Sequence, residues 1–105
     1  MVVANTFKGL KAANPALRVG GPATAQLAWL DDFVAGAVGA GAPPDFVSSH
    51  LYPTDPWAHE DVLSHRREDF FGAISGAAEI VAAAAKKHRL PVTMPFLLTE
   101  FNCGL

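Results

Sequence analysis

Short apolar segments alternate along this chain with longer segments of helical periodicity, and this alternation limits the possible folds more than any other feature. The segments of strand character are residues 17–19, residues 45–52 and Phe96–Phe101. A helical pattern precedes each of them: one ending at Asn14-Pro15, one over residues 27–38, and the longest over residues 70–88. Strands joined through helices pair in parallel with right-handed crossovers, so the sequence predicts an α/β protein.

Two architectures fit this order of elements: an open doubly wound sheet and a (β/α)8 barrel. A barrel of that kind takes about 250 residues, whereas this chain has 105 residues. The sequence therefore predicts a single unit over residues 1–105, either a small open sheet or part of a larger barrel.

Composition and charge favour a packed protein that acts on a small ligand. Half of the residues are hydrophobic and 17% are charged, which is typical of globular proteins rather than disordered ones. The net charge is −2 and no dense run of Lys and Arg occurs, so we expect neither nucleic acid nor an anionic membrane as a partner. No long apolar run predicts a spanning helix, and the first residues do not resemble a signal peptide. We expect a soluble chain, with its compartment left open.

Polar side chains occur where the second and third strands end. If side chains alternate strictly, each strand places one set on a single face. The two sets are Phe46, Ser48, His50 and Tyr52 in the second strand, and Phe96, Leu98, Glu100 and Asn102 in the third. Ligands of parallel α/β folds bind at the carboxyl ends of strands, so the last two members of each set are expected to line one pocket. The alternative is that strand ends are simply wet and take polar residues by default.

Glu100 has chemistry that its expected neighbours lack, because a carboxylate at a strand end can act as a nucleophile or a general base. Glycoside hydrolysis with retention needs two carboxylates about 5–5.5 Å apart. Asp45 begins its strand and is expected at the opposite end of the sheet. The other acidic residues of the connecting segment are more simply solvated: Glu60, Asp61, Glu68 and Asp69. The residues alone therefore predict no partner for Glu100.

The segment "HEDVLSH" resembles a zinc-protease helix only in part. Leu63 stands where the H-E-x-x-H motif needs its second histidine, and His65 lies too far along from His59. Cys103 is the single cysteine and has no visible activating group beside it. We expect no metal site and no cofactor.

Three blocks of the sequence resemble consecutive blocks of glycoside hydrolase family 39, the β-xylosidase and α-L-iduronidase group: "LRVGGPATAQLAWLDDFV", "PPDFVSSHLYPTD" and "PFLLTEFN". The resemblance covers essentially the whole chain, in the order of the family. It implies a partial (β/α)8 TIM barrel, in which the three strands are roughly the fifth to the seventh with their helices. The block at residues 20–23 would end the fifth strand.

The resemblance also implies roles for particular residues. Glu100 corresponds to the catalytic nucleophile, in a T-E-W/F-N context. His50 and Tyr52 correspond to an H-x-Y-P block that lines the sugar site, and His50 and Asn102 are the expected hydrogen-bonding support. Trp57 is expected either to stack on a sugar ring or to pack within the fold.

The same resemblance implies that one catalytic group is missing. The general acid/base glutamate of the family is carried in an N-E-P motif, which this chain lacks. The expected function is thus that of a fragment of a retaining, β-xylosidase-like glycoside hydrolase with a carbohydrate substrate, inactive alone. The alternatives are a non-catalytic carbohydrate-binding or assembly half-barrel and a small open-sheet enzyme that uses another nucleophile. Oligomeric state is left open.

Overall fold

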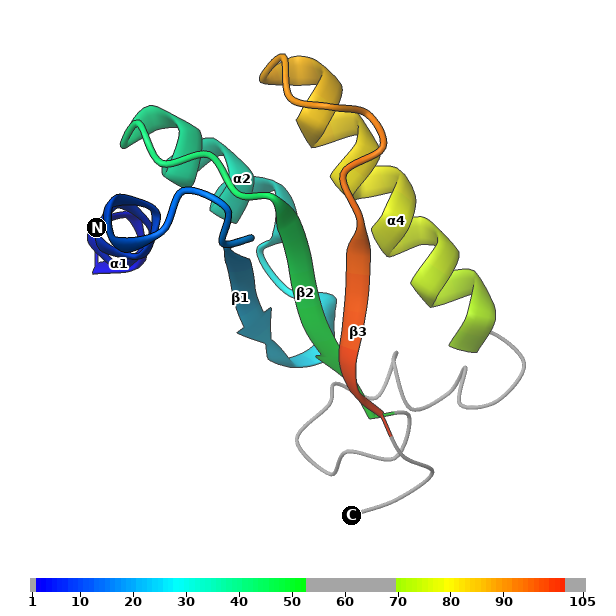
Figure 1. Cartoon of the computed structure of the whole chain (residues 1–105). Coiled ribbons are helices and arrows are strands. Elements are labelled where there is room, and N and C mark those ends of the chain that lie inside the picture. The colour runs from blue at the N-terminus through cyan, green and yellow to red at the C-terminus, as the bar shows by residue number, and fades with distance from the viewer. Residues whose placement is uncertain (1, 53–69, 102–105) are drawn as a thin grey trace.

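A computed structural model describes residues 2–52 and 70–101 and contains a parallel sheet of three strands in the order β1-β2-β3 (Figure 1). The helices lie between the strands along the chain, as the alternation predicts, so the α/β class is confirmed. In chain order the elements are α1 (Val2–Ala13), β1 (Gly20–Thr24), the 3-10 turn η1 (Ala25–Leu27), α2 (Leu30–Gly39), β2 (Phe46–Leu51), α4 (Phe70–Lys87) and β3 (Phe96–Phe101).

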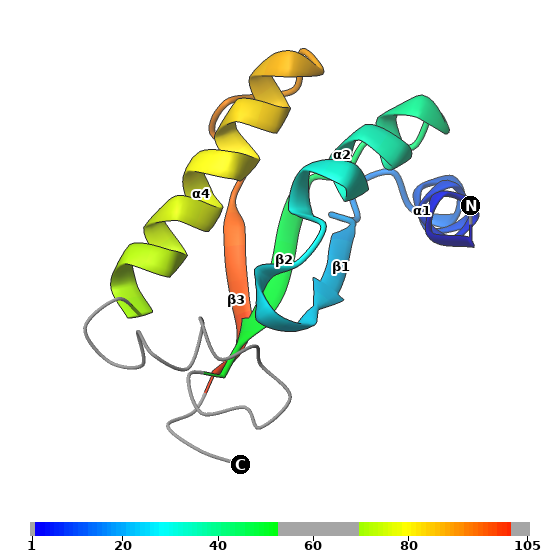
Figure 2. The same ribbon diagram turned by 180° about the vertical axis from the view of Figure 1, so that it is seen from behind.

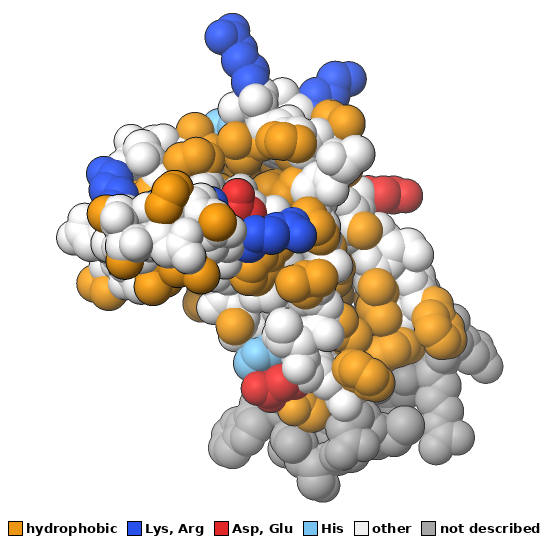
Figure 3. All heavy atoms as spheres, in the orientation of Figure 1, with side chains coloured by type: hydrophobic (Ala, Val, Ile, Leu, Met, Phe, Trp, Pro, Cys, Tyr) orange, Lys and Arg blue, Asp and Glu red, His pale blue; other side chains and the backbone are white. Residues whose placement is uncertain are grey.

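Helices α2 and α4 cover one face of the sheet (Figures 1 and 2). Val34 of α2, Val47 of β2 and Val81 of α4 are fully buried in the core between them. Helix α1 joins the same core beside β1, where the rings of Phe7 and Phe33 meet edge to face with centroids 6.3 Å apart. No described element covers the other face of the sheet, and Figure 3 shows hydrophobic side chains exposed on that side.

Both β2 and β3 lie where the apolar patterns predict them, and so does the long helix α4. The first strand was predicted wrongly, because the sheet uses residues Gly20–Thr24 rather than residues 17–19. A Cβ on Gly20 would overlap the carbonyl oxygen of Phe46, so only glycine lets β1 approach β2 at this point. Gly20, which follows the predicted strand, is thus the residue that allows β1 to pair with β2.

The second helix begins later than its periodicity predicts, at Leu30 rather than at Leu27. Gln26, Leu27 and Trp29 have left-handed backbone angles, with φ of 54°, 58° and 58°. That conformation cannot propagate a right-handed helix, so the apolar periodicity runs into a turn before α2 starts.

The expectation of strict alternation is wrong in β3. Phe96 and Leu98 pair with Val47 and Ser49, on the face that the helices cover. Glu100 pairs instead with His50, because the register shifts by one residue between Leu98 and Glu100. A β-bulge at this point thus moves Glu100 to the uncovered face.

No helix among the residues that the structure describes is both long and apolar enough to cross a membrane.

Candidate active site

Glu100 lies at the carboxyl end of β3, and both of its carboxylate oxygens have a neighbour from the end of β2. The hydroxyl of Tyr52 donates a hydrogen bond of 2.7 Å to Oε2. Nε2 of His50 lies 3.5 Å from Oε1. The Glu100 side chain is 52% exposed and that of His50 only 21%. The carboxylate is therefore oriented by one hydrogen bond and has His50 close to its other oxygen, while part of it stays open to solvent.

The hydrogen bond to Glu100 has an electrostatic consequence for Tyr52. Because the phenol donates to a carboxylate, its neutral form is favoured and the pKa of Tyr52 is raised above its ordinary value. Tyr52 is thus a proton-bearing donor toward Glu100 at neutral pH.

The backbone of Tyr52 is hydrogen-bonded to the connection between β1 and α2. The side-chain amide of Gln26, in η1, donates a hydrogen bond of 3.0 Å to the Tyr52 carbonyl oxygen. Gln26 has a left-handed backbone conformation and is half-buried. All three strand ends are consequently linked at the carboxyl edge: β1 through Gln26, β2 through Tyr52 and β3 through Glu100.

Of the five site residues that the sequence and the resemblance indicate, the structure brings His50, Tyr52 and Glu100 together. Asn102 and Trp57 lie outside the described residues, as do Cys103 and the whole "HEDVLSH" segment. Sequence reasoning missed Gln26, for which no sequence signal exists. It also missed the bulge in β3, although the adjacent polar residues Thr99 and Glu100 interrupt the alternation and could have indicated it.

Among residues 2–52 and 70–101, no second carboxylate contacts Glu100. Asp45 precedes β2 at the opposite end of the strands, as expected. The remaining described acids lie on the helices that cover the other face of the sheet: Asp31, Asp32 and Glu79. The same stretches of chain contain no group of three or more His, Cys, Asp or Glu side chains that could hold a metal ion.

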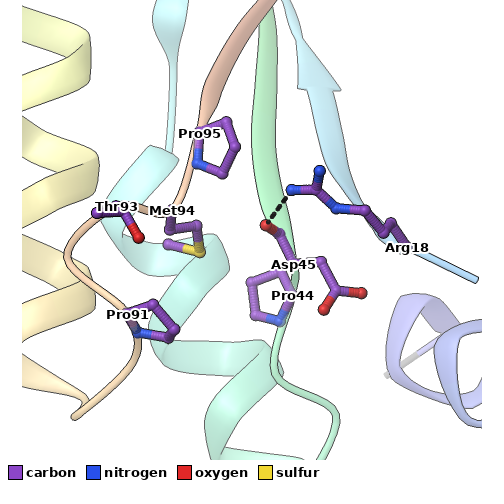
Figure 4. Close-up of a pocket in the computed structure, with 7 residues that line it drawn as sticks. All are labelled: Arg18, Pro44, Asp45, Pro91, Thr93, Met94 and Pro95. Atoms are coloured by element: carbon purple, nitrogen blue, oxygen red, sulfur yellow. Dashed lines mark hydrogen bonds between the residues drawn. The ribbon is translucent and has the colours of Figure 1, made fainter. Parts of the chain in front are cut away.

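A pocket of about 220 Å³ lies at the amino ends of the strands rather than beside Glu100 (Figure 4). The guanidinium of Arg18 donates a 3.5 Å hydrogen bond to the Asp45 carbonyl oxygen in its wall. Ligands of parallel α/β folds bind at the opposite, carboxyl ends. This pocket and the Glu100 carboxylate therefore lie at opposite ends of the sheet. The other residues that line it are Pro44, Pro91, Thr93, Met94 and Pro95.

Glu100 thus lies at the carboxyl edge of a parallel sheet, with Tyr52 hydrogen-bonded to it and His50 3.5 Å away. The model of glycosyl hydrolases family 39 matches residues 2–104, nearly the whole chain. The chain belongs to glycosyl hydrolase family 39. This family 39 chain is similar to a β-xylosidase of Caldicellulosiruptor saccharolyticus, with 48% identity over 46 residues.

Solved structures of the same family share its fold. The family 39 enzyme of Xanthomonas axonopodis pv. citri matches 96% of this chain with 32% identity and a TM-score of 0.68. A family 39 β-xylosidase of Caulobacter crescentus matches 92% with 31% identity and a TM-score of 0.61. The parallel α/β fold of this family 39 chain thus resembles a portion of the family's TIM barrel.

The chain is much shorter than these relatives. It covers 18% of the C. crescentus structure and 20% of the X. axonopodis structure. The match to the C. saccharolyticus β-xylosidase involves 44% of this chain and 9% of that protein.

Proposed function

We propose that this chain supplies the nucleophile of a retaining, β-xylosidase-like glycoside hydrolase, and that Glu100 is that nucleophile. The observation that carries the proposal is the Glu100 carboxylate at the carboxyl edge of the sheet, hydrogen-bonded by Tyr52 and 3.5 Å from His50. The relatives named as β-xylosidases make a β-xyloside the expected class of substrate.

In this mechanism the Glu100 carboxylate attacks the anomeric carbon and displaces the leaving oxygen, which gives a covalent glycosyl-enzyme. The hydrogen bond from Tyr52 orients the carboxylate before the attack and keeps one oxygen in place. His50 limits rotation on the other side. Both interactions position the nucleophile along a single direction, which raises the fraction of productive encounters.

The general acid that protonates the leaving group belongs to a part of the barrel that this chain does not contain. The lack of a second described carboxylate beside Glu100 supports this, since retention needs one about 5–5.5 Å away. Strands β1 to β3 correspond to the fifth to seventh strands of the barrel on this proposal, with Asn102 and Trp57 as further sugar contacts.

The first experiment measures the isolated chain on an aryl β-xyloside. We expect no turnover, because one carboxylate on three strands cannot complete the double displacement. Turnover that disappears in Glu100→Gln would contradict the proposal that the general acid lies elsewhere.

The second experiment tests Glu100 in a closed barrel. Residues 2–104 replace the matching segment of the C. crescentus β-xylosidase, and kcat is measured for the chimera. Glu100→Gln is expected to lower kcat on the order of 10⁴-fold. The control is Glu79→Gln, which changes an exposed carboxylate on α4 in the same way and leaves kcat unchanged. Added azide should rescue the Glu100→Ala chimera and give a glycosyl azide of inverted configuration. An active chimera that tolerates Glu100→Gln would remove Glu100 from this role.

A second candidate is an assembly or carbohydrate-binding half-barrel without catalysis. The strand order favours it, because β1 and β3 are both edge strands of a sheet with one face uncovered by any described element. Light scattering combined with titration by xylose separates the two candidates. A stable dimer that binds xylose would favour the half-barrel, and an inert monomer the fragment of an enzyme.

A further inference from the structure

Two irregularities of the sheet lie at the same level, on either side of one residue of the central strand. Between β1 and β2, the register passes from Pro22 to Thr24 and leaves Ala23 unpaired. Between β2 and β3, it passes from Leu98 to Glu100 and leaves Thr99 unpaired. Ser49 is the central-strand residue next to both bulges.

The bulge in β3 decides which face Glu100 occupies. Leu98 pairs with Ser49 on the helix-covered face, and strict alternation would place the side chain at position 100 on that face too. One unpaired residue reverses the facing of the side chains that follow it, so Glu100 pairs with His50 and shares its face of the sheet. Without the bulge, the carboxylate would be directed toward the helices and away from Tyr52.

Hydroxyl groups cross the sheet at the level of the two bulges. Thr99 donates its hydroxyl to the carbonyl oxygen of Ser49 at 3.2 Å. The Ser49 hydroxyl, which is fully buried, donates to the carbonyl oxygen of Thr24. The Thr24 hydroxyl in turn donates to the carbonyl oxygen of Ala28 at 2.7 Å. One hydroxyl from each strand thus takes part in a continuous set of contacts across β1, β2 and β3.

The hydroxyls of Ser49 and Thr99 differ in whether they need a protein partner for their hydrogen bonds. A buried hydroxyl such as that of Ser49 needs a hydrogen-bond partner to offset its lost hydration, whatever its position does for the site. Thr99 is exposed, so water could satisfy its hydroxyl equally well. Its bond to Ser49 is therefore not required for solvation. The bond does connect the unpaired residue to the neighbouring strand where the ladder is interrupted.

We propose that Thr99 is a positioning residue whose hydroxyl holds the bulge of β3 and thereby directs Glu100 toward Tyr52 and His50. The importance of this device for catalysis rests on the proposed role of Glu100. Its geometry can nevertheless be measured without any turnover.

The measurement uses Tyr52, which is the only tyrosine of the chain. Ultraviolet absorption of the phenolate gives its titration directly. In the unmodified chain the pKa of Tyr52 lies above the ordinary value because of the bond to Glu100, and Glu100→Gln gives the reference titration without the carboxylate. We expect Thr99→Val, which keeps the branched shape and removes the hydroxyl, to shift the Tyr52 titration to that reference. Thr99→Ser is expected to restore the raised value.

The matched control is Thr6→Val in α1. Thr6 also donates its hydroxyl to a carbonyl oxygen, that of Val2 at 3.1 Å, but lies far from the site. We expect this variant to leave the Tyr52 titration unchanged. Circular dichroism over the titrated range shows which variants keep their helices.

A raised Tyr52 pKa that persists in folded Thr99→Val would overturn the inference. If that variant does not fold, Thr99→Ala gives the same comparison without the added apolar branch. If neither folds, Thr99→Ser decides: an ordinary Tyr52 pKa in a folded serine variant overturns the inference, and a raised one supports it. An active chimera that tolerates Glu100→Gln would refute the nucleophile and leave these titrations as they are, so the two proposals fail separately.

Discussion

Single atoms set how closely β1 and β2 approach each other. Gly20 pairs with Phe46, and a Cβ built on Gly20 would lie 2.5 Å from Cδ2 and 2.6 Å from Cγ of that ring. It would also overlap the Phe46 carbonyl oxygen, which belongs to the backbone and cannot rotate away. The pairing of β1 with β2 thus requires a residue without a side chain at this position. The turn η1, which follows β1, then bonds to Tyr52 through Gln26.

Gly20→Ala is expected to destabilise the chain by about 1–3 kcal/mol, as overpacking does where a neighbour cannot move. The measurement is urea unfolding followed by circular dichroism. Gly9→Ala is the control, because the Cβ at this α1 position has nothing within 4 Å. That substitution should instead stabilise the helix by about 0.5–1 kcal/mol. Equal stability of the two variants would show that the close approach at Gly20 is relieved without cost.

Helices α2 and α4 are held to the sheet by a core of small and branched side chains. Val34 and Val81 are both fully buried, and alanines of α2 and α4 allow the helix backbones to lie close to each other and to β2. The buried alanines are Ala37, Ala77, Ala84 and Ala85. Side chains at such close contacts can shift only a little. A lost methyl group therefore leaves a cavity that the neighbours fill only in part.

Val81→Ala should lower the free energy of unfolding by about 2 kcal/mol, from the transfer of two methyl groups and the cavity left behind. The adjacent residue of the same helix is the control, because Ile80 is 47% exposed. Ile80→Ala should cost less than about 1 kcal/mol. Urea unfolding of both variants gives the comparison, and a larger loss for Ile80→Ala would place α4 in a different orientation on the sheet.

At the scale of the whole molecule, the two ends of the sheet have different roles. At the amino end Asp45 joins three segments: its carboxylate lies 2.7 Å from Nζ of Lys11 in α1 and accepts the Val19 N–H at 2.8 Å. Burial by itself would raise the pKa of Asp45. The hydrogen bonds from Lys11 and Val19, with the positive charges of Lys11 and Arg18, outweigh burial and lower the pKa below its usual value. Stabilising contacts thus gather at the end opposite Glu100, as in barrels generally.

The Asp45 contribution to stability depends on pH in a definite direction. The pKa of the folded state is lower than that of the unfolded chain, which is about 3.9, so the stabilisation is fully present above that value and disappears as pH falls through the folded pKa. Asp45→Asn should lower stability at pH 7 by about 1 kcal/mol. Urea unfolding at several pH values measures this. The two proteins should become similar in acid, and a constant difference at every pH would exclude the charged contacts as the cause.

Much of the fold could be predicted from the order of the residues. The apolar runs that give β2, β3 and α4 are bounded by Pro or by polar segments, and these boundaries depend on local periodicity alone. Glu100 could be assigned to a strand end for the same reason. Since parallel strands align their carboxyl ends, its approach to His50 and Tyr52 also followed from the order of the elements.

The face on which Glu100 lies could not be predicted in this way, because it depends on the residues across the sheet. The alternation of "FLLTEF" alone places Glu100 with Phe96, and the unpaired Thr99 reverses this only when β3 pairs with β2. In the same way, Gly20 and Gly21 indicate a turn locally, yet they form a strand because they pair with Phe46 and Val47 of β2. Local sequence thus specifies which elements form and in what order, whereas register and facing are properties of pairs of strands and arise only when the strands meet.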